Sequence, residues 1–522
     1  MIAAVQALLR GGFDRAERAL DRLVGPQANP LAQLGALGYF FFWIVAVSGL
    51  YLFVFFDTGV TRAFESVAWM SGPQWWHAGV VRSFHRYASD LMIVTMFLHL
   101  MREFSLDRFR GARWFSWFSG IPLIAFLYVS GITGYWLVWD KLAQYVAITS
   151  TELLDWMPIF GEPIARNFLD ATSLSSRFFT LLVFLHIAAP IALLFAMWVH
   201  IQRISRPRVN PPRLLGGVVL FSLLAVSLLM PAHSQEPANL AQVPSPVKLD
   251  SLFLALYPLA DRAPGAAWAG LAAFGLLMAL APFLPRRRQP APAKIFLDHC
   301  NGCGRCVDDC PYEALRLTRR TDGAVYLQEA IVDPSKCVSC GICVGSCPSS
   351  TPFRRSQELV TGIDLPDYPL VRMRQDLIAN CAAMTEGPRI LAISCPHGAG
   401  KHLAPGPHLG VLELPCVAMA PPSLIDFALS RGHADGVAVI GCAESSCYNR
   451  LGVDWTEQRF AHERDPYLRA RVPRERLATI WASTTQKGAM NRSIEALRAR
   501  IAGLEAKNPS PEPAAPQEEI LS

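Results

Sequence analysis

Apolar residues gather into six long runs within the first 285 positions of this 522-residue chain. An α-helix needs about 20 mostly apolar residues to cross a bilayer, and each run comes close to that length. We therefore predict six membrane-spanning helices, at about 35–56, 82–104, 115–139, 178–201, 214–231 and 266–284. The stretch before the first run mixes apolar positions with four arginines and predicts an amphipathic helix on the membrane surface; these are Arg10, Arg15, Arg18 and Arg22.

Basic residues collect in alternate loops between the runs, at 102–113, 203–213 and 286–288, and the other loops are mixed or acidic. The positive-inside bias then places the N terminus and everything after the sixth run in the cytoplasm, at a bacterial-type inner (plasma) membrane. The chain is 52% hydrophobic and 17% charged, which excludes an ordinary soluble enzyme of this size. Its net charge of +6 comes from these loops, so we predict no nucleic-acid binding.

Four histidines interrupt two of the apolar runs: His85 and His99 in the second, and His186 and His200 in the fourth. Within each pair the spacing is 14 residues, almost four helical turns, so both imidazoles face one way, about 21 Å apart along the axis. Two such helices side by side would hold two metal centres stacked across a bilayer about 30 Å thick. Neutral imidazole is an axial ligand of haem iron. The pattern predicts a membrane cytochrome with two haems, whereas four unrelated buried polar groups would not share one spacing.

Glycines repeat the same interval of 14 residues in the first and third runs. A residue without a side chain lets the backbone approach a flat ligand closely, so we predict one such gap beside each haem. These haem-facing glycines are Gly35, Gly49, Gly120 and Gly134. Arg82 and Arg102 flank the histidines of the second run and would pair with haem propionates; the alternative is that they are ordinary interfacial arginines.

All 13 cysteines come after the last run, from Cys300 onward. A cytoplasmic domain is kept reduced, so clustered cysteines there indicate metal rather than disulfides. After an Arg- and Pro-rich linker at 286–294, the pattern C-x2-C-x2-C-x3-C-P occurs twice, as in two-cluster ferredoxins. We predict a ferredoxin-like α+β domain at 295–355 with two [4Fe–4S] clusters, because zinc sites do not call for this repeat. Since the fourth cysteine crosses over in such proteins, the predicted ligand sets are Cys300, Cys303, Cys306 and Cys347 for one cluster, and Cys337, Cys340, Cys343 and Cys310 for the other.

Short apolar strands at 389–394, 410–414 and 436–440 alternate with helical stretches and predict a small α/β domain with a parallel sheet at 385–485. A cysteine follows each strand, and strand ends are where such folds place their sites. The set is Cys395, Cys416, Cys442 and Cys447. Taken alone it suits a [2Fe–2S] cluster or zinc, and beside two ferredoxin clusters iron–sulfur is favoured. Cys381 stands apart as a buried structural thiol, and 505–522 is predicted to be a disordered tail.

The first 285 residues resemble cytochrome b of the quinol-oxidising bc and b-f complexes, most of all the split form of photosynthetic membranes. The resemblance rests on G-V-V-R-S-F-H-R-Y-A around His85, H-L-M-R from His99 and S-G-I-T-G-Y-W-L-V-W-D ending at Asp140. The haem b ligands that it implies are His85 with His186 for the outer haem and His99 with His200 for the inner haem. The split form carries a third, covalent haem on a cysteine where this chain has Gln33, so we expect none here.

This chain departs further from that family at the quinol-oxidation motif. Where the family has Pro-Glu-Trp-Tyr before the sixth span, this chain has Leu249, Asp250, Ser251 and Leu252. Only the acidic character survives, so the resemblance implies that Asp250 would accept a proton from quinol. The alternative is a solvated loop carboxylate without catalytic role.

The last 140 residues resemble the delta subunit of methyl-viologen-reducing hydrogenase. The resemblance rests on Cys395, on L-P-C-V around Cys416 and on A-D-G-V-A-V-I-G-C-A-E-S-S-C-Y from Ala434. That subunit passes electrons through one [2Fe–2S] cluster to flavoproteins of the heterodisulfide-reductase type, which implies a partner of this kind.

Together these patterns predict a multidomain chain: an all-α transmembrane bundle with two haems, a ferredoxin-like domain and a small α/β domain. The expected function is a quinone-linked oxidoreductase subunit that passes electrons between the membrane quinone pool and a cytosolic flavoprotein or heterodisulfide-reductase-like complex. One alternative is a membrane anchor that docks a cytosolic redox complex without a quinone site of its own. A redox sensor is a third, although no effector domain is evident in the sequence. The cytochrome b resemblance also implies a homodimer.

Overall fold

The structure is a computed structural model that describes residues 2–25, 28–159, 163–164, 176–202, 209–284, 290–353, 359–443, 447–484 and 486–507. It forms two compact units, Met1–Pro285 and Arg286–Ser522, called here the first and second unit. Residues 286–289 of the predicted linker, the end of the tail from 508 and positions 444–446 of the last cysteine motif lie outside the described residues.

In the residues that the structure describes, the regular structure of the first unit is helical. Its helices are α1 (Ile2–Val24), α2 (Leu34–Phe53), α3 (Arg62–Ser71), α4 (Val80–Ser105), α5 (Trp114–Val138), α6 (Lys141–Asp155), α7 (Ser176–Ile201), α8 (Arg213–Leu229), α9 (Tyr257–Arg262) and α10 (Pro264–Leu280). Each of the six predicted spans coincides with one of them: α2, α4, α5, α7, α8 and α10.

Four of the described helical segments are long and apolar enough to cross a membrane by length and composition: Pro30–Phe53, Trp114–Val138, Phe179–Ile201 and Pro264–Phe283. Helix α4 is long enough, but its end turns carry charged residues, among them Arg82, Arg102 and Glu103. Helix α8 has 17 residues. The first unit is therefore a membrane domain, and the count of six spans stays a prediction.

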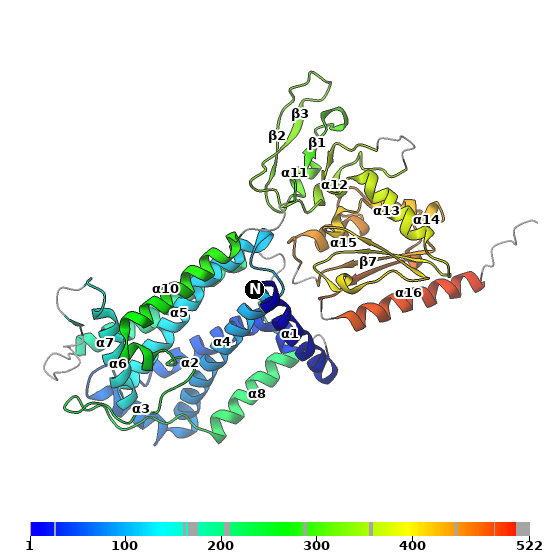
Figure 1. Ribbon diagram of the computed structural model, residues 1–522. Coiled ribbons are helices and arrows are strands. Elements are labelled where there is room, and N and C mark those ends of the chain that lie inside the picture. The colour runs from blue at the N-terminus through cyan, green and yellow to red at the C-terminus, as the bar shows by residue number, and fades with distance from the viewer. Residues whose placement is uncertain are drawn as a thin grey trace, which may run out of the picture. The chain divides into compact units, whose positions relative to one another are not determined.

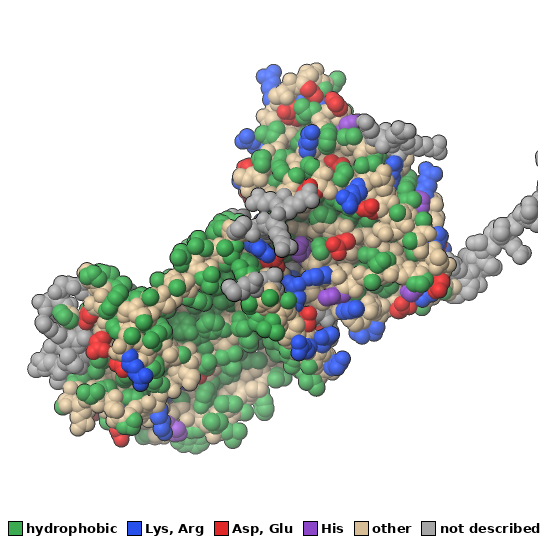
Figure 2. Space-filling model, in the orientation of Figure 1, with side chains coloured by type: hydrophobic (Ala, Val, Ile, Leu, Met, Phe, Trp, Pro, Cys, Tyr) green, Lys and Arg blue, Asp and Glu red, His purple; other side chains and the backbone are tan. Residues whose placement is uncertain are grey.

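Helices α2 and α4 lie side by side, as do α5 and α7, and a buried apolar cluster joins all four (Figure 1). Large apolar side chains also cover the outside of the unit, as the visible face in Figure 2 shows. Phe195, Phe221 and Leu229 are 66%, 74% and 81% exposed. An apolar surface on this scale is costly in water and suits lipid.

Helix α1 binds the last turn of α4. The side chains of Gln6 and Arg10 donate hydrogen bonds to the Phe104 and Ser105 carbonyls at the end of α4. Those carbonyls are left without helical partners because the helix ends there. The predicted helix is thus present and is held by specific polar contacts, whereas apolar side chains such as Leu8 and Leu23 stay exposed, at 74% and 79%.

The loop between α8 and α9 crosses the ends of α4 and α6. Asp140 caps α6 by accepting from the Ala143 amide (2.9 Å), and its other oxygen accepts from the Gln235 amide (2.8 Å). At α4, the Ala232 amide donates to Ser83 Oγ (2.9 Å). These bonds fix the loop that carries Asp250.

In the described residues of the second unit there are three small sheets. Its strands are β1 (Lys294–Ile295), β2 (Leu315–Arg319), β3 (Gln328–Val332), β4 (Ile363–Asp364), β5 (Ile390–Ser394), β6 (Leu409–Glu413), β7 (Gly436–Gly441) and β8 (Leu477–Trp481). Strand β1 pairs with β4 and β2 with β3, both antiparallel, whereas β6-β5-β7-β8 is a parallel sheet. The three predicted strands of this parallel sheet are present, and β8 adds a fourth.

Helices cover both faces of the parallel sheet (Figure 1). The helices of this unit are α11 (Arg305–Asp308), α12 (Ile342–Ser346), α13 (Leu370–Ala382), α14 (Pro422–Ser430), α15 (Gly452–Phe460) and α16 (Lys487–Lys507). Alternate residues of the strands point to opposite faces: Leu391 and Val437 join the core under α13 and α14, and Ile390 and Ile440 join the core under α16. Cys381 lies in the first of these cores and is 2% exposed.

Candidate functional site

Each of the four span histidines faces one of the four glycines predicted to lie beside a haem, on the neighbouring helix. Helix α2 supplies the glycines for the histidines of α4, and α5 supplies those for α7. The pairs are Gly35 with His99, Gly49 with His85, Gly120 with His200, and Gly134 with His186. A Cβ atom at any of the four glycines would lie 3.0–3.6 Å from the imidazole Cε1. Any larger side chain would therefore compete for the space beside the ring.

His85 on α4 and His186 on α7 approach each other across the bundle. Their ring centroids are 6.4 Å apart. Two imidazoles that bind one metal through nitrogen, at about 2 Å each, have centroids about 6 Å apart. The observed separation thus fits an iron ion held between the two rings. At the other end of the helices, His200 lies close enough to His99 for the two rings to interact electrostatically.

Hydroxyl groups contact the Nδ1 ring nitrogen of three of these histidines. The contacts to Nδ1 are Ser48 with His85 (3.0 Å), Ser119 with His200 (3.0 Å) and Thr133 with His186 (3.3 Å), and the Ser130 carbonyl lies nearer to the His186 nitrogen (3.0 Å). Ser48 donates its only proton to the Ile44 carbonyl (2.6 Å), so its oxygen is left to accept from the ring N–H. This fixes the tautomer and leaves Nε2 free to bind a metal.

Sequence reasoning missed these hydroxyl residues, although a signal was present. Each stands immediately before a haem-facing glycine, as Ser-Gly or Thr-Gly. Leu34, before Gly35, breaks this pattern, so no hydroxyl residue precedes the glycine that faces His99.

Both arginines predicted to pair with propionates have partners in the protein. Arg82 donates to Ala232 O (3.1 Å) and Ser234 Oγ (2.8 Å), which anchors the α8–α9 loop. Arg102 is 9% exposed, and its Nε lies 2.7 Å from Glu17 Oε1 on α1. These contacts give both arginines a structural role, and their pairing with propionates stays a prediction.

Asp250 lies over the ends of α4 and α5, where its carboxylate accepts from Arg86 and from the Tyr135 hydroxyl. The Leu252 amide donates to its other oxygen (2.6 Å). Burial alone would raise the pKa of Asp250, but the bonds from Tyr135 and Arg86 outweigh it and hold that pKa below its usual value. The carboxylate is thus charged and fully engaged, which makes it a weak proton acceptor.

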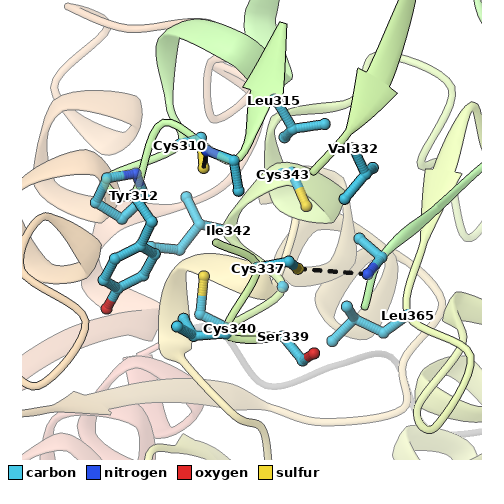
Figure 3. A pocket seen from close by; sticks show the side chains of 15 residues that line it. Cys310, Tyr312, Leu315, Val332, Cys337, Ser339, Cys340, Ile342, Cys343 and Leu365 are labelled. Atoms are coloured by element: carbon cyan, nitrogen blue, oxygen red, sulfur yellow. Dashed lines mark hydrogen bonds between the residues drawn. The ribbon is translucent and has the colours of Figure 1, made fainter. Parts of the chain in front are cut away.

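The two ferredoxin-type cysteine runs exchange their last members around two cavities. The first set lines one cavity and consists of Cys300, Cys303, Cys306 and Cys347. The second set lines the other, shown in Figure 3, and consists of Cys310, Cys337, Cys340 and Cys343. Gly304 and Gly341 have φ of +78° and +76°, which lets each loop turn so that several sulfurs face one point. These groupings match the predicted crossover sets.

The chemistry of the second cavity fits an iron–sulfur cluster. Backbone amides point at the sulfurs: Ala293 N lies 3.5 Å from Cys337 Sγ, and Ala314 N lies 3.4 Å from Cys310 Sγ. Burial raises the pKa of Cys340 to about 12, so its thiolate needs a cation beside it. Iron would supply that cation, and the amides would stabilise the sulfurs of a cluster.

The four cysteines after the strands of the parallel sheet form a third set: Cys395, Cys416, Cys442 and Cys447. Strands β5 and β7 are neighbours at the point where the order of the sheet reverses, which is where such sheets bind ligands. Cys395 and Cys442 directly follow them, with their sulfurs 3.8 Å apart. The whole set is buried, with exposures of 2–5%.

Helix α15 begins with a glycine beside this third set. A Cβ at Gly452 would lie 2.4 Å from Cys416 Sγ and 3.6 Å from Cys447 Sγ. The missing side chain therefore leaves room around the sulfurs. In the part of the chain that the structure describes, no group of three or more Cys, His, Asp or Glu side chains is arranged to hold a single metal ion.

Comparison with known protein families gives three matches in order along the chain. The model of the family cytochrome b/b6/petB matches residues 20–207. The 4Fe-4S dicluster domain matches residues 299–351, and the delta subunit of methyl-viologen-reducing hydrogenase matches residues 398–505. The predicted resemblances are thus confirmed, and the matches support a membrane electron-transfer subunit with haem and iron–sulfur domains.

Among solved structures, the chain is similar to one described as hyperthermophilic respiratory Complex III. The two share 21% sequence identity with a TM-score of 0.40, over 49% of this chain and 76% of the other.

Proposed function

We propose that this chain is the electron-transfer subunit of a quinone-linked oxidoreductase in an inner-membrane setting. Electrons would pass between the quinone pool and a cytosolic flavoprotein or heterodisulfide-reductase-like complex. The carriers would be two b haems, two [4Fe–4S] clusters and one [2Fe–2S] cluster. The proposed ligands are His85 with His186, His99 with His200, and the first, second and third cysteine sets.

The pairing of histidines with glycines carries the haem part of this proposal. Four independent His–Gly contacts recur on two helix pairs, and hydroxyls contact Nδ1 of three of the four rings, joined at His186 by the Ser130 carbonyl. Bound haem would supply one-electron chemistry. The residues of the chain hold Nε2 free, provide flat gaps beside the rings and exclude water with the surrounding apolar cluster.

The third set supports a [2Fe–2S] cluster and an exit toward a partner. Its four soft sulfur ligands lie at the ligand-binding edge of the sheet, next to a glycine that leaves room for more than a thiol pair. The match to the hydrogenase delta subunit covers three of these four cysteines. In the proposed topology the N terminus and the second unit are both cytoplasmic, so the third set would serve a cytosolic partner.

The decisive experiment follows haem absorption and cluster EPR after a quinol analogue is added to the purified protein. We expect the haems to be reduced first and the clusters afterwards. His99→Leu should remove the inner haem and stop cluster reduction by quinol. His77→Leu is the matched control, because His77 belongs to the same unit but bonds Tyr51 and Gln74. Unchanged cluster reduction in His99→Leu would rule out the route.

The second candidate is a docking anchor that has haems but no working outer quinol site. The engagement of Asp250 by Arg86 and Tyr135 favours it, because accepting a quinol proton would require one of these bonds to break. In this case quinol would leave the haems oxidised, while a reductant acting through the iron–sulfur clusters would still reduce them.

A further inference from the structure

One buried arginine links all three cysteine sets. Arg459, near the end of α15, is 1% exposed. Its Nη2 donates to Asp309 Oδ2 (2.6 Å) and Ser346 Oγ (2.7 Å), and its Nη1 donates to the Ala418 carbonyl (2.8 Å). A buried guanidinium with three acceptors is fixed in position, because releasing any one of them leaves a polar group unsatisfied.

Each acceptor of Arg459 stands next to a cysteine of a different set. Asp309 precedes Cys310 of the second set, Ser346 precedes Cys347 of the first set, and Ala418 follows Cys416 of the third set by two positions. The arginine therefore ties three ligand loops to one rigid group. At its other end, helix α15 carries Gly452 against the third set, so both ends of this short helix lie beside cysteine ligand loops.

The second and third sets meet at this junction. Cys340 packs against the buried cluster that contains Cys416 and Ala418, and it is also an electrostatic neighbour of Cys416. Gly345 of α12 allows the approach, because a Cβ there would lie 2.0 Å from the Ala418 carbonyl. The close approach singles out the second set as the neighbour of the third.

The junction also carries positive charge. Asp309, 2% exposed, pairs with both Arg459 and Arg464, so the three groups together have a net charge of +1. Reduction adds negative charge to an iron–sulfur cluster. Positive charge beside the cluster therefore favours the reduced form and raises the reduction potential.

We propose that Arg459 is a positioning residue that makes the second-set cluster the direct electron-transfer partner of the third-set cluster and raises the reduction potential of both. In the step itself one electron leaves one cluster and enters the other, and no bond forms or breaks. The inference rests on the proposed function in so far as the three sets hold iron–sulfur clusters. It goes further by naming the order of the clusters and the residue that fixes it.

The test compares three variants of the full-length protein: Arg459→Gln, Arg459→Lys and the matched control Arg471→Gln. Arg471 pairs with Asp426, a buried carboxylate that, like Asp309, holds two arginines. Redox titration with dithionite, followed by low-temperature EPR and iron analysis, gives the midpoint potential of each cluster and the spin coupling between the second and third.

Arg459→Gln should lower both midpoint potentials and weaken the coupling while iron content stays unchanged. Arg459→Lys keeps the charge, so it should recover the potentials but not the coupling. The control should match the wild-type protein. Wild-type potentials and coupling in an iron-replete Arg459→Gln protein would overturn the proposal, as would a third set that gives no EPR signal because it holds zinc.

A second variant decides the matter if Arg459→Gln fails to assemble. Gly345→Ala keeps every ligand and charge, but its Cβ would lie 2.0 Å from the Ala418 carbonyl oxygen and 2.8 Å from Arg459 Nη1, so α12 must move away from both. Weaker coupling between the second and third clusters would support the proposal, and unchanged coupling would refute it. Dithionite reduces the clusters without haem or quinol. The coupling between the second and third clusters can therefore be measured even if the protein does not oxidise quinol.

Discussion

At the scale of single residues, the hydroxyls beside the histidines offer a direct test of the haem sites. Ser48→Ala removes the hydroxyl acceptor of the His85 Nδ1 proton and leaves, among the described residues, only the backbone of Val45 to bond the ring. The ring becomes less basic, ferric haem is stabilised less, and the potential of the outer haem should rise. A hydrogen bond of about 1 kcal/mol corresponds to about 40 mV for one electron. Redox titration of the haem bands measures the shift. Ser89→Ala, whose hydroxyl bonds the Arg86 carbonyl, should leave the potential unchanged.

The glycines make a sharper prediction about haem content. Gly49→Val would place branched methyl groups against the His85 ring, since a Cβ already lies 3.0 Å from Cε1. We expect one of the two haems to be lost while the other remains, because Gly35 and His99 are untouched. Gly38→Val on the same helix is the control, since a Cβ at Gly38 meets nothing within 4 Å. The haem-to-protein ratio of the purified variants checks this, and two haems in Gly49→Val would contradict it.

At the scale of elements, the start of α15 should be needed for the third set alone. Gly452→Ala puts a Cβ 2.4 Å from Cys416 Sγ, so the third cluster should be lost while the first two remain. Iron analysis and EPR of the purified protein distinguish the three. Gly503→Ala in α16 meets nothing within 4 Å and should keep all clusters, with helix stability raised by up to about 1 kcal/mol. A full complement of clusters in Gly452→Ala would refute this role of the glycine.

Asp364 should give the second unit a pH-dependent stability. It ends β4 and accepts from the Leu370 amide at the start of α13 (3.0 Å). Burial raises the pKa of Asp364 to about 6, so the folded state favours the protonated form. The resulting stability is complete below the unfolded pKa of 3.8 and is lost as the pH rises through about 6. The loss amounts to at most about 3 kcal/mol.

Asp364→Asn cannot ionise and should therefore be more stable than the wild-type protein at pH values well above 6, and no more stable well below 4. Denaturant unfolding on either side of this window, followed by far-UV circular dichroism, measures the difference. An equal difference at both ends would show that the carboxyl group does not titrate in this range.

The sequence predicted the elements that follow from local pattern. Apolar runs gave α2, α5 and α10, and motif spacing alone grouped the cysteines that line each cavity. What it could not predict depends on contacts between distant segments. From the sequence, Arg102 resembles an interfacial arginine, but in the structure it pairs with Glu17 of α1. Nothing near Arg459 in the sequence indicates that it pairs with Asp309. Strand β8 has the short, mixed sequence of an edge strand and carries no cysteine to draw attention to it.

At the scale of the whole molecule, two stacked haems would couple electron transfer to the membrane potential. The histidines of α4 are 14 residues apart, which is about 21 Å of a hydrocarbon core about 30 Å thick. An electron that passes from one haem to the other thus crosses about 0.7 of the field. At about 2.3 kcal/mol per charge per 100 mV, each 100 mV of membrane potential changes the free energy of this step by about 1.6 kcal/mol.

This coupling predicts that the balance between the two haems depends on voltage. In proteoliposomes, an imposed potential of about 100 mV should shift the ratio of reduced inner to reduced outer haem by about 15-fold, the equivalent of about 1.6 kcal/mol. The split absorption bands of the haems report the ratio, and an uncoupler should restore its starting value. Because Arg471→Gln alters only an ion pair in the second unit, it should respond in full. If the ratio did not respond in the wild-type protein, the haems would lie at the same depth, and the 14-residue spacing would not run along the membrane normal.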